Sequence, residues 1–137
     1  MASLLNPYLA FDGQANEAME FYKGVFGGEL NVHRFGDSGP QEGVNPDGVM
    51  HAQLQTKAGF TLMASDMPPG MPLQAGNNMS ISLSGEDEAE LRGCWDALSG
   101  SGTVTVPLEK QVWGDTFGMC VDKFGVAWMV NIVQSQA

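Results

Sequence analysis

Residues 5–35 read LNPYLAFDGQANEAMEFYKGVFGGELNVHRF, and this stretch decides the fold. Residues 5–11 form a short apolar run that predicts a β-strand, and Asp12-Gly13 ends it and offers an N-cap for a helix. Gly27-Gly28 ends that helix, as glycine does at a C-terminal cap, and an extended segment follows at 29–35. Between these limits the apolar residues recur at the spacing of one helix face: Ala15, Ala18, Met19, Tyr22, Val25 and Phe26.

The rest of the sequence continues this pattern and then repeats it. Extended segments at 49–56 and 60–65 flank the turn Lys57-Ala58-Gly59 and predict a hairpin. A strand at 79–84 then precedes a helix whose start is crowded with acidic residues, which suit the positive end of the helix dipole. Three more strands follow, at about 103–108, 112–121 and 127–133. The order is βαβββ twice, with an offset of about 70 residues between the halves.

We therefore predict an α+β fold and a single domain over residues 1–137, with one module at about 4–66 and a second at about 77–134. A half with one helix cannot cover both faces of its sheet. Two halves side by side would make one curved sheet, with helices outside and a concave face inside. The Gly/Pro-rich stretches 36–48 and 66–77 are either ordinary surface loops or lids over that concave face.

Composition excludes several classes of function. The chain has 6 Lys+Arg against 16 Asp+Glu, a formal net charge of -10, which argues against nucleic-acid binding and against an anionic membrane surface. Its apolar runs are far shorter than a membrane span, and the N-terminus carries no export signal. Cys94 and Cys120 are too few for a disulfide scaffold and indicate reduced thiols. We expect a cytoplasmic protein.

Several separated segments have a familiar order: PYLAFDG at 7–13, EAMEFY at 17–22, GGEL at 27–30, VMHA at 49–52, LMASD at 62–66, WGD at 113–115 and DKFGVAW at 122–128. With these segments the chain resembles, from about residue 5 to 133, the vicinal oxygen chelate superfamily, which includes glyoxalases, bleomycin-resistance proteins and extradiol dioxygenases, and within it the PhnB-like branch. The resemblance implies two βαβββ modules that form a cupped barrel, usually in homodimers, with a divalent metal in the cup of active members.

The ligands that this resemblance implies can be compared with the chain position by position. The first-strand ligand falls near Asn6 or Tyr8, the fourth-strand position near Thr61 or Met63, the fifth-strand ligand at Ser80 and the last-strand ligand at Met129. These residue types do not make a site for Zn²⁺, Ni²⁺, Mn²⁺ or Fe²⁺. We therefore expect no metal and no other cofactor.

Other candidates come from strand alternation. His51 shares a face with Gln53 and Gln55, and it is either an acid, base or hydrogen-bond donor in the cup or a histidine satisfied by polar neighbours. We expect His33 to face solvent or an edge, and Trp128 to lie in the core. Trp113 either stacks on a ligand at the rim or packs in the core. The candidate ligand-binding residues are Tyr8, His51, Gln53, Met63, Ser80, Ser82, Trp113, Met129 and Asn131.

Three functions remain open. The first is a module that binds a small, largely apolar or aromatic molecule without metal. The second is a glyoxalase-, dioxygenase- or lyase-type enzyme that uses a metal, or an acid–base pair such as His51 with Asp115 or Tyr8. The third is a structural or regulatory dimer with a vestigial cup. PhnB-like chains are sometimes described as methyltransferases, but no cofactor-binding glycine motif supports methyl transfer here. We expect a small-molecule ligand and a homodimer.

Overall fold

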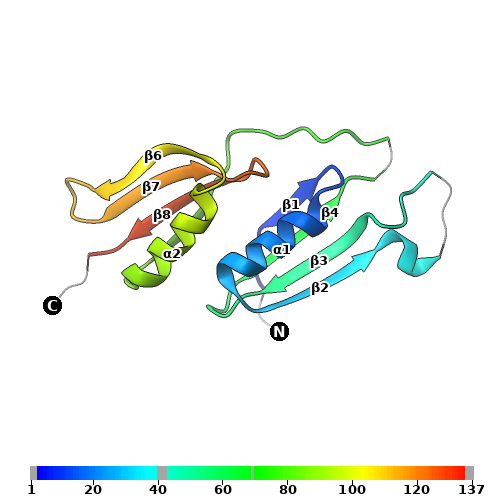
Figure 1. Cartoon of the computed structure of the whole chain (residues 1–137), viewed down its shortest axis with the longest axis horizontal. Helices are drawn as coiled ribbons and strands as arrows, with labels where there is room; N and C mark the ends of the chain where they lie inside the picture. The colour runs from blue at the N-terminus through cyan, green and yellow to red at the C-terminus, as the bar shows by residue number, and fades with distance from the viewer. Residues whose placement is uncertain (1–2, 40–42, 69, 135–137) are drawn as a thin grey trace. The chain divides into compact units, whose positions relative to one another are not determined.

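The computed structural model describes residues 3–39, 43–68 and 70–134. Parts of the two predicted lids, residues 40–42 and 69, lie outside the described residues. The chain divides into two compact units, 1–74 and 75–137, and each is a four-stranded sheet with one α-helix (Figure 1). The α+β fold predicted from the sequence is confirmed.

The first unit follows the predicted βαβββ order. Its sheet has the strand order β1-β4-β3-β2, in which β1 and β4 are parallel and the other neighbours are antiparallel. The turn predicted between β3 and β4 is present at 56–60. The elements are β1 (Tyr8–Phe11), α1 (Ala15–Phe26), β2 (Glu29–Arg34), the 3₁₀ turn η1 (Phe35–Ser38), β3 (Val49–Gln55) and β4 (Thr61–Asp66).

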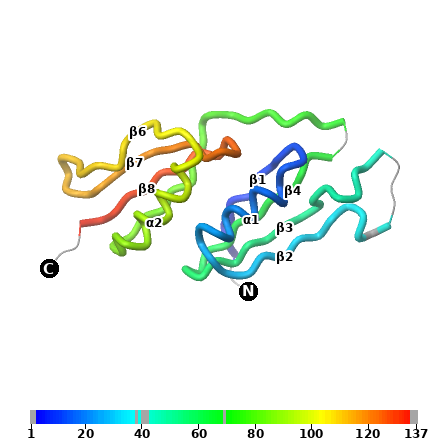
Figure 2. The backbone as a smooth tube through the Cα atoms, in the orientation of Figure 1, coloured from blue at the N-terminus to red at the C-terminus, as the bar shows by residue number. Residues whose placement is uncertain are grey.

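Helix α1 covers one face of this sheet and leaves the other uncovered within the unit. It packs on β2, β3 and β4 (Figure 2). The residues of its apolar stripe from Ala15 to Tyr22 are buried, as the helical spacing predicts, and Val25 and Phe26 at its end are half-buried. Burying such side chains contributes about 25 cal/mol per Å² of apolar surface. The fully buried residues of this layer are Ala15, Ala18, Met19, Tyr22, Val49, Ala52, Leu54, Leu62 and Ala64.

The cap of α1 comes from a residue distant in sequence. The N-cap position is Gln14, and the predicted cap from Asp12-Gly13 is wrong. The Ala15 backbone N–H donates to Oδ1 of Asp66 at 2.9 Å, and the Val49 N–H donates to Oδ2 of the same carboxylate at 2.9 Å. Asp66 is buried at the end of β4, so one side chain joins α1, β3 and β4.

The second unit repeats this topology with the order β5-β8-β7-β6, in which β5 and β8 are parallel. Helix α2 packs on β5, β7 and β8, where Leu98, Trp128 and Val130 are fully buried. The prediction that Trp128 lies in the core is confirmed. The elements are β5 (Ile81–Gly85), α2 (Glu88–Ser99), β6 (Thr103–Lys110), β7 (Thr116–Val121) and β8 (Ala127–Ile132).

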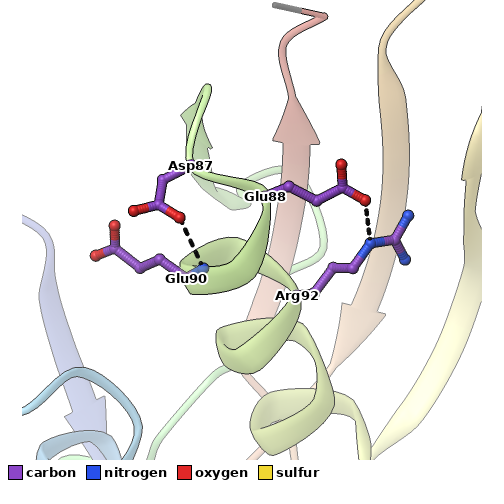
Figure 3. Close-up of polar contacts among 4 residues, drawn as sticks. All are labelled: Asp87, Glu88, Glu90 and Arg92. Atoms are coloured by element: carbon purple, nitrogen blue, oxygen red, sulfur yellow. Dashed lines mark hydrogen bonds and ion pairs between the residues drawn. The ribbon is translucent and has the colours of Figure 1, made fainter.

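The acidic start of α2 forms a local cap, as its composition predicts. Oδ1 of Asp87 accepts a hydrogen bond from the Glu90 backbone N–H at 3.1 Å (Figure 3). In the same first turn, Oε2 of Glu88 lies 2.7 Å from Nε of Arg92, four residues on, and the two side chains form an exposed ion pair. Such pairs contribute only about 0.3–0.5 kcal/mol, so the cap matters more than the pair.

Several strand boundaries differ from the prediction, and two of the differences lie beside candidate site residues. The predicted strand 112–121 begins only at Thr116, because Gln111–Asp115 form the turn between β6 and β7, with the Gly114 N–H bonded to the Gln111 carbonyl. The predicted strand 79–84 begins at Ile81, and Met79 is 82% exposed. Apolar residues outside the strands continue the strand alternation in sequence, which explains both errors.

Candidate functional site

The uncovered face of the first sheet carries a row of polar and thioether side chains. Because directly paired residues point to the same face, the register places Tyr8 beside Met63, Met63 beside Gln53 and Gln53 beside Asn31. Each of these residues alternates with one that α1 buries, such as Leu54 or Ala64. We call this surface the first open face. It brings together four residues predicted from the sequence: Tyr8, His51, Gln53 and Met63.

His51 lies on the first open face and is bonded to Tyr8. Tyr8 Oη and His51 Nδ1 are 3.2 Å apart, and the two ring centroids are 5.8 Å apart. Since β4 lies between β1 and β3, the two side chains reach across this strand to meet. The contact satisfies one nitrogen of His51 and leaves Nε2 as its second hydrogen-bonding atom.

His33 faces His51 directly. It is exposed on the edge strand β2, as the sequence predicts, and it pairs in register with His51. The two imidazoles therefore lie on the same face of neighbouring strands. Sequence reasoning missed this pairing, because the two strands are far apart in sequence and no tight turn between them fixes their register. Alternation along each strand gives the face of a residue but not its partner.

The uncovered face of the second sheet is more apolar. Met129 pairs with Ser82 on one side and Met119 on the other, and Asn131 pairs with Ser84 and Phe117. These residues alternate with Trp128, Val130 and Ile132, which are buried under α2. We call this surface the second open face. The predicted residues Ser82, Met129 and Asn131 share it, whereas Ser80 is exposed and precedes β5.

Trp113 and Asp115 lie in the turn at the end of the second open face. Trp113 is 61% exposed, so of its two predicted roles core packing is wrong, and its ring centroid is 6.2 Å from that of Phe117. Oδ1 of Asp115 accepts from the Gln134 backbone N–H at 3.0 Å, and Oδ2 accepts from Asn131 Nδ2 at 3.1 Å. These bonds, the backbone bond first, hold the pKa of Asp115 below its usual value.

A family comparison agrees with this arrangement. The family model described as 3-demethylubiquinone-9 3-methyltransferase matches residues 3–131, nearly the whole chain. The chain belongs to this PhnB-like family. The chain is 27% identical to the protein YjdN of Escherichia coli, and the match covers 96% of this chain and 97% of YjdN.

Solved structures support the same assignment. The PhnB-like protein is 40% identical to PA1353 from Pseudomonas aeruginosa, with a TM-score of 0.86, over 98% of the present chain and 100% of PA1353. The chain is also 26% identical to a PhnB protein from Bacillus cereus, with a TM-score of 0.77. This match covers 96% of the present chain and 100% of the Bacillus cereus chain.

More distant structures confirm the superfamily fold. A glyoxylase/bleomycin resistance protein/dioxygenase domain from Frankia is 13% identical with a TM-score of 0.67, over 98% of this chain and 99% of that domain. The fosfomycin resistance protein FosX from Mesorhizobium loti is 10% identical with a TM-score of 0.60, over 98% and 95%. At these identities the likeness concerns the fold alone.

The residues of the PhnB-like protein do not fit the divalent metal of the superfamily. The implied positions hold Tyr8 or Asn6, Met63 or Thr61, Ser80, and Met129, none of which supplies an imidazole or a carboxylate. Within residues 3–39, 43–68 and 70–134, no group of three or more His, Cys, Asp or Glu side chains could hold a metal ion. The donor set at these positions therefore gives no basis for a metal-dependent step.

The two cysteines are buried free thiols, Cys94 on α2 and Cys120 on β7. Burial raises the pKa of both Cys94 and Cys120, which disfavours the reactive thiolate. Among the described residues, no helix is long and apolar enough to cross a membrane, and α1 and α2 have 12 residues each.

Proposed function

We propose that the PhnB-like protein binds a small, largely apolar or aromatic molecule on its open faces, without the divalent metal usual in the superfamily. One observation carries this proposal: Phe117, Met119 and Met129 lie together on the second open face, on strands that a helix backs from the other side. Half-exposed aromatic and thioether side chains gain free energy when a flat apolar ligand covers them.

Polar residues on the second open face would orient the bound ligand through hydrogen bonds. The amide of Asn131 already donates to Asp115, which fixes its orientation and leaves its oxygen to accept from a ligand. Ser82 and Ser84 add hydroxyl groups at the β5 side of the same face. A mostly apolar surface with a few oriented polar groups is typical of small-molecule sites.

A ligand panel with matched variants tests the proposal. Planar aromatic and aliphatic compounds would be screened for an increase in melting temperature, and the affinity of any hit measured by calorimetry. Trp113→Ala, which removes an exposed ring beside Phe117, is expected to weaken the affinity about tenfold, or roughly 1.4 kcal/mol. Val112→Ala, at the fully exposed neighbour in the same turn, is the control. A flat response across many chemotypes contradicts the proposal and favours a vestigial site.

The bond between Tyr8 and His51 favours a second candidate, an acid–base enzyme of the glyoxalase or lyase type. In such an enzyme Tyr8 would fix the tautomer and ring orientation of His51, and His51 would accept or return a proton. His51→Gln should then lower kcat by about 100-fold or more on any substrate turned over. Tyr8→Phe should lower it less and change its pH profile. Unchanged turnover in His51→Gln would exclude this mechanism.

We also propose that the protein is cytoplasmic and acts as a homodimer. The two buried free thiols are consistent with a reducing compartment. We do not propose methyl transfer, because the segments leading into the helices, Asp12–Gln14 and Gly85–Asp87, carry one glycine each and lack the G-x-G spacing that cradles a nucleotide cofactor.

A further inference from the structure

The chain has two histidines, and the fold places them opposite each other. His33 on β2 and His51 on β3 are register partners in an antiparallel pair, so their side chains leave the same face of the sheet. Directly opposed residues have Cβ atoms about 4.5–5.5 Å apart. Both side chains are at least partly accessible, and neither is held in the packing beneath α1.

This spacing suits a shared metal ion. An imidazole nitrogen binds Zn²⁺ at about 2.0–2.1 Å, so two nitrogens of one tetrahedral ion lie about 3.3 Å apart. Two imidazoles whose Cβ atoms are about 5 Å apart can reach this separation by rotation about their side-chain bonds, without movement of the strands. Imidazole is the protein ligand that Zn²⁺, Ni²⁺ and Cu²⁺ share.

The surroundings of His51 prepare it for this role. Histidine ligands usually use one ring nitrogen for the metal and the other for a hydrogen bond that orients the ring. Tyr8 Oη lies 3.2 Å from Nδ1 of His51, and when Nδ1–H donates to this oxygen, the lone pair of Nε2 is available to a metal. The formal net charge of -10 also favours the approach of a cation.

We propose that His33 and His51 together bind one borderline divalent cation, such as Zn²⁺, with water in the remaining positions. This site lies on β2 and β3. It is distinct from the positions implied by the superfamily resemblance, which fall on the first and last strands of each module. The proposal rests on the paired imidazoles of His33 and His51 alone. It does not depend on the residues at the superfamily positions, which are poor metal ligands.

Zinc titration of the full chain tests the site. We expect one Zn²⁺ per chain by calorimetry at neutral pH, and we expect the ring-nitrogen NMR signals of both histidines to shift together. His33→Asn and His51→Asn should each weaken binding at least tenfold, because each leaves a single imidazole. Tyr8→Phe should weaken it less, because it removes only the orienting bond.

The chain offers a control that preserves composition. The double change Asn31→His with His33→Asn moves the imidazole two positions along β2, on the same face but opposite Gln53. This variant keeps two histidines and the same net charge, and it should lose binding as His33→Asn does. Zinc binding as tight as in the native chain, a shift of only one histidine, or no binding at millimolar Zn²⁺ would each overturn the proposal.

Discussion

The carboxylate of Asp66 stabilises the first unit by accepting hydrogen bonds from two backbone N–H groups. It accepts from Ala15 at the start of α1 and from Val49 at the start of β3, and it is buried. Asp66→Ala should therefore lower the free energy of unfolding by about 2–4 kcal/mol, since it removes the carboxylate that accepts from both buried N–H groups. Urea unfolding followed by circular dichroism measures this change.

Asp12→Ala is the matched control, because Asp12 is the exposed residue that the sequence suggested as the cap. Its effect should stay within about 0.5 kcal/mol. Equal destabilisation by the two changes would contradict the assignment of the cap to Asp66.

Two glycines near the C-terminal end of α1, one inside the helix and one after it, should respond to alanine with opposite signs. Gly24 lies inside the helix, and a Cβ there meets open space among the described residues, so Gly24→Ala should stabilise by about 0.5–1 kcal/mol. Gly28, with φ of 106°, follows the helix, and its Cβ would overlap the Gln55 carbonyl oxygen. Gly28→Ala should destabilise by more than about 1 kcal/mol. Thermal unfolding of both variants gives the signs, and two shifts in the same direction would contradict this account.

The turn between β6 and β7 is tied to the end of β8 by Asp115. Hydrogen bonds from the Gln134 N–H and from Asn131 lower the pKa of this carboxyl in the folded chain. Because the folded pKa lies below the unfolded one, the stabilisation is present above the unfolded pKa and is lost as the pH falls through the folded pKa. Asn131→Ala should raise the pKa of Asp115 only part of the way to its usual value, because the backbone bond remains.

Carboxyl ¹³C NMR during acid titration reports this change, and Asn77→Ala, in an exposed loop, is the control. An unchanged Asp115 titration in Asn131→Ala would show that the amide bond has no part in the shift.

Helices and strands were predictable from the sequence where their hydrophobic periodicity extends over several helical turns or several strand residues. The stripe of Ala15, Met19 and Tyr22 fixed the position of α1, because only one helix face matches it. The cap by Asp66 and the pairing of His33 with His51 were not predictable, because each joins residues far apart in the chain. Trp113 was ambiguous for a related reason: a turn and a strand end carry similar apolar residues.

At the scale of the whole molecule, the repeated βαβββ order is confirmed in two units with the same strand order and the same parallel pair. Repetition was readable because the helix stripe and the glycines that follow it recur in the second half. The joining of both units into a single domain stays a prediction, as do the ligand-binding roles of the open-face residues. Which side chains meet a ligand depends on chemistry that strand alternation does not encode.

The proposed homodimer leads to a prediction about salt. Each chain carries a formal net charge of -10, so two copies repel each other at low ionic strength. Added salt screens this repulsion, with a Debye length that falls from about 30 Å at 0.01 M to about 8 Å at 0.15 M. Sedimentation at micromolar concentration should give a species of twice the 14.6 kDa chain mass, and the dimer should tighten between these two salt concentrations. A chain that sediments as a monomer throughout this range contradicts the dimer. A dimer that weakens with salt would instead mean that attractive charge pairs, rather than apolar contact opposed by net charge, hold the two copies together.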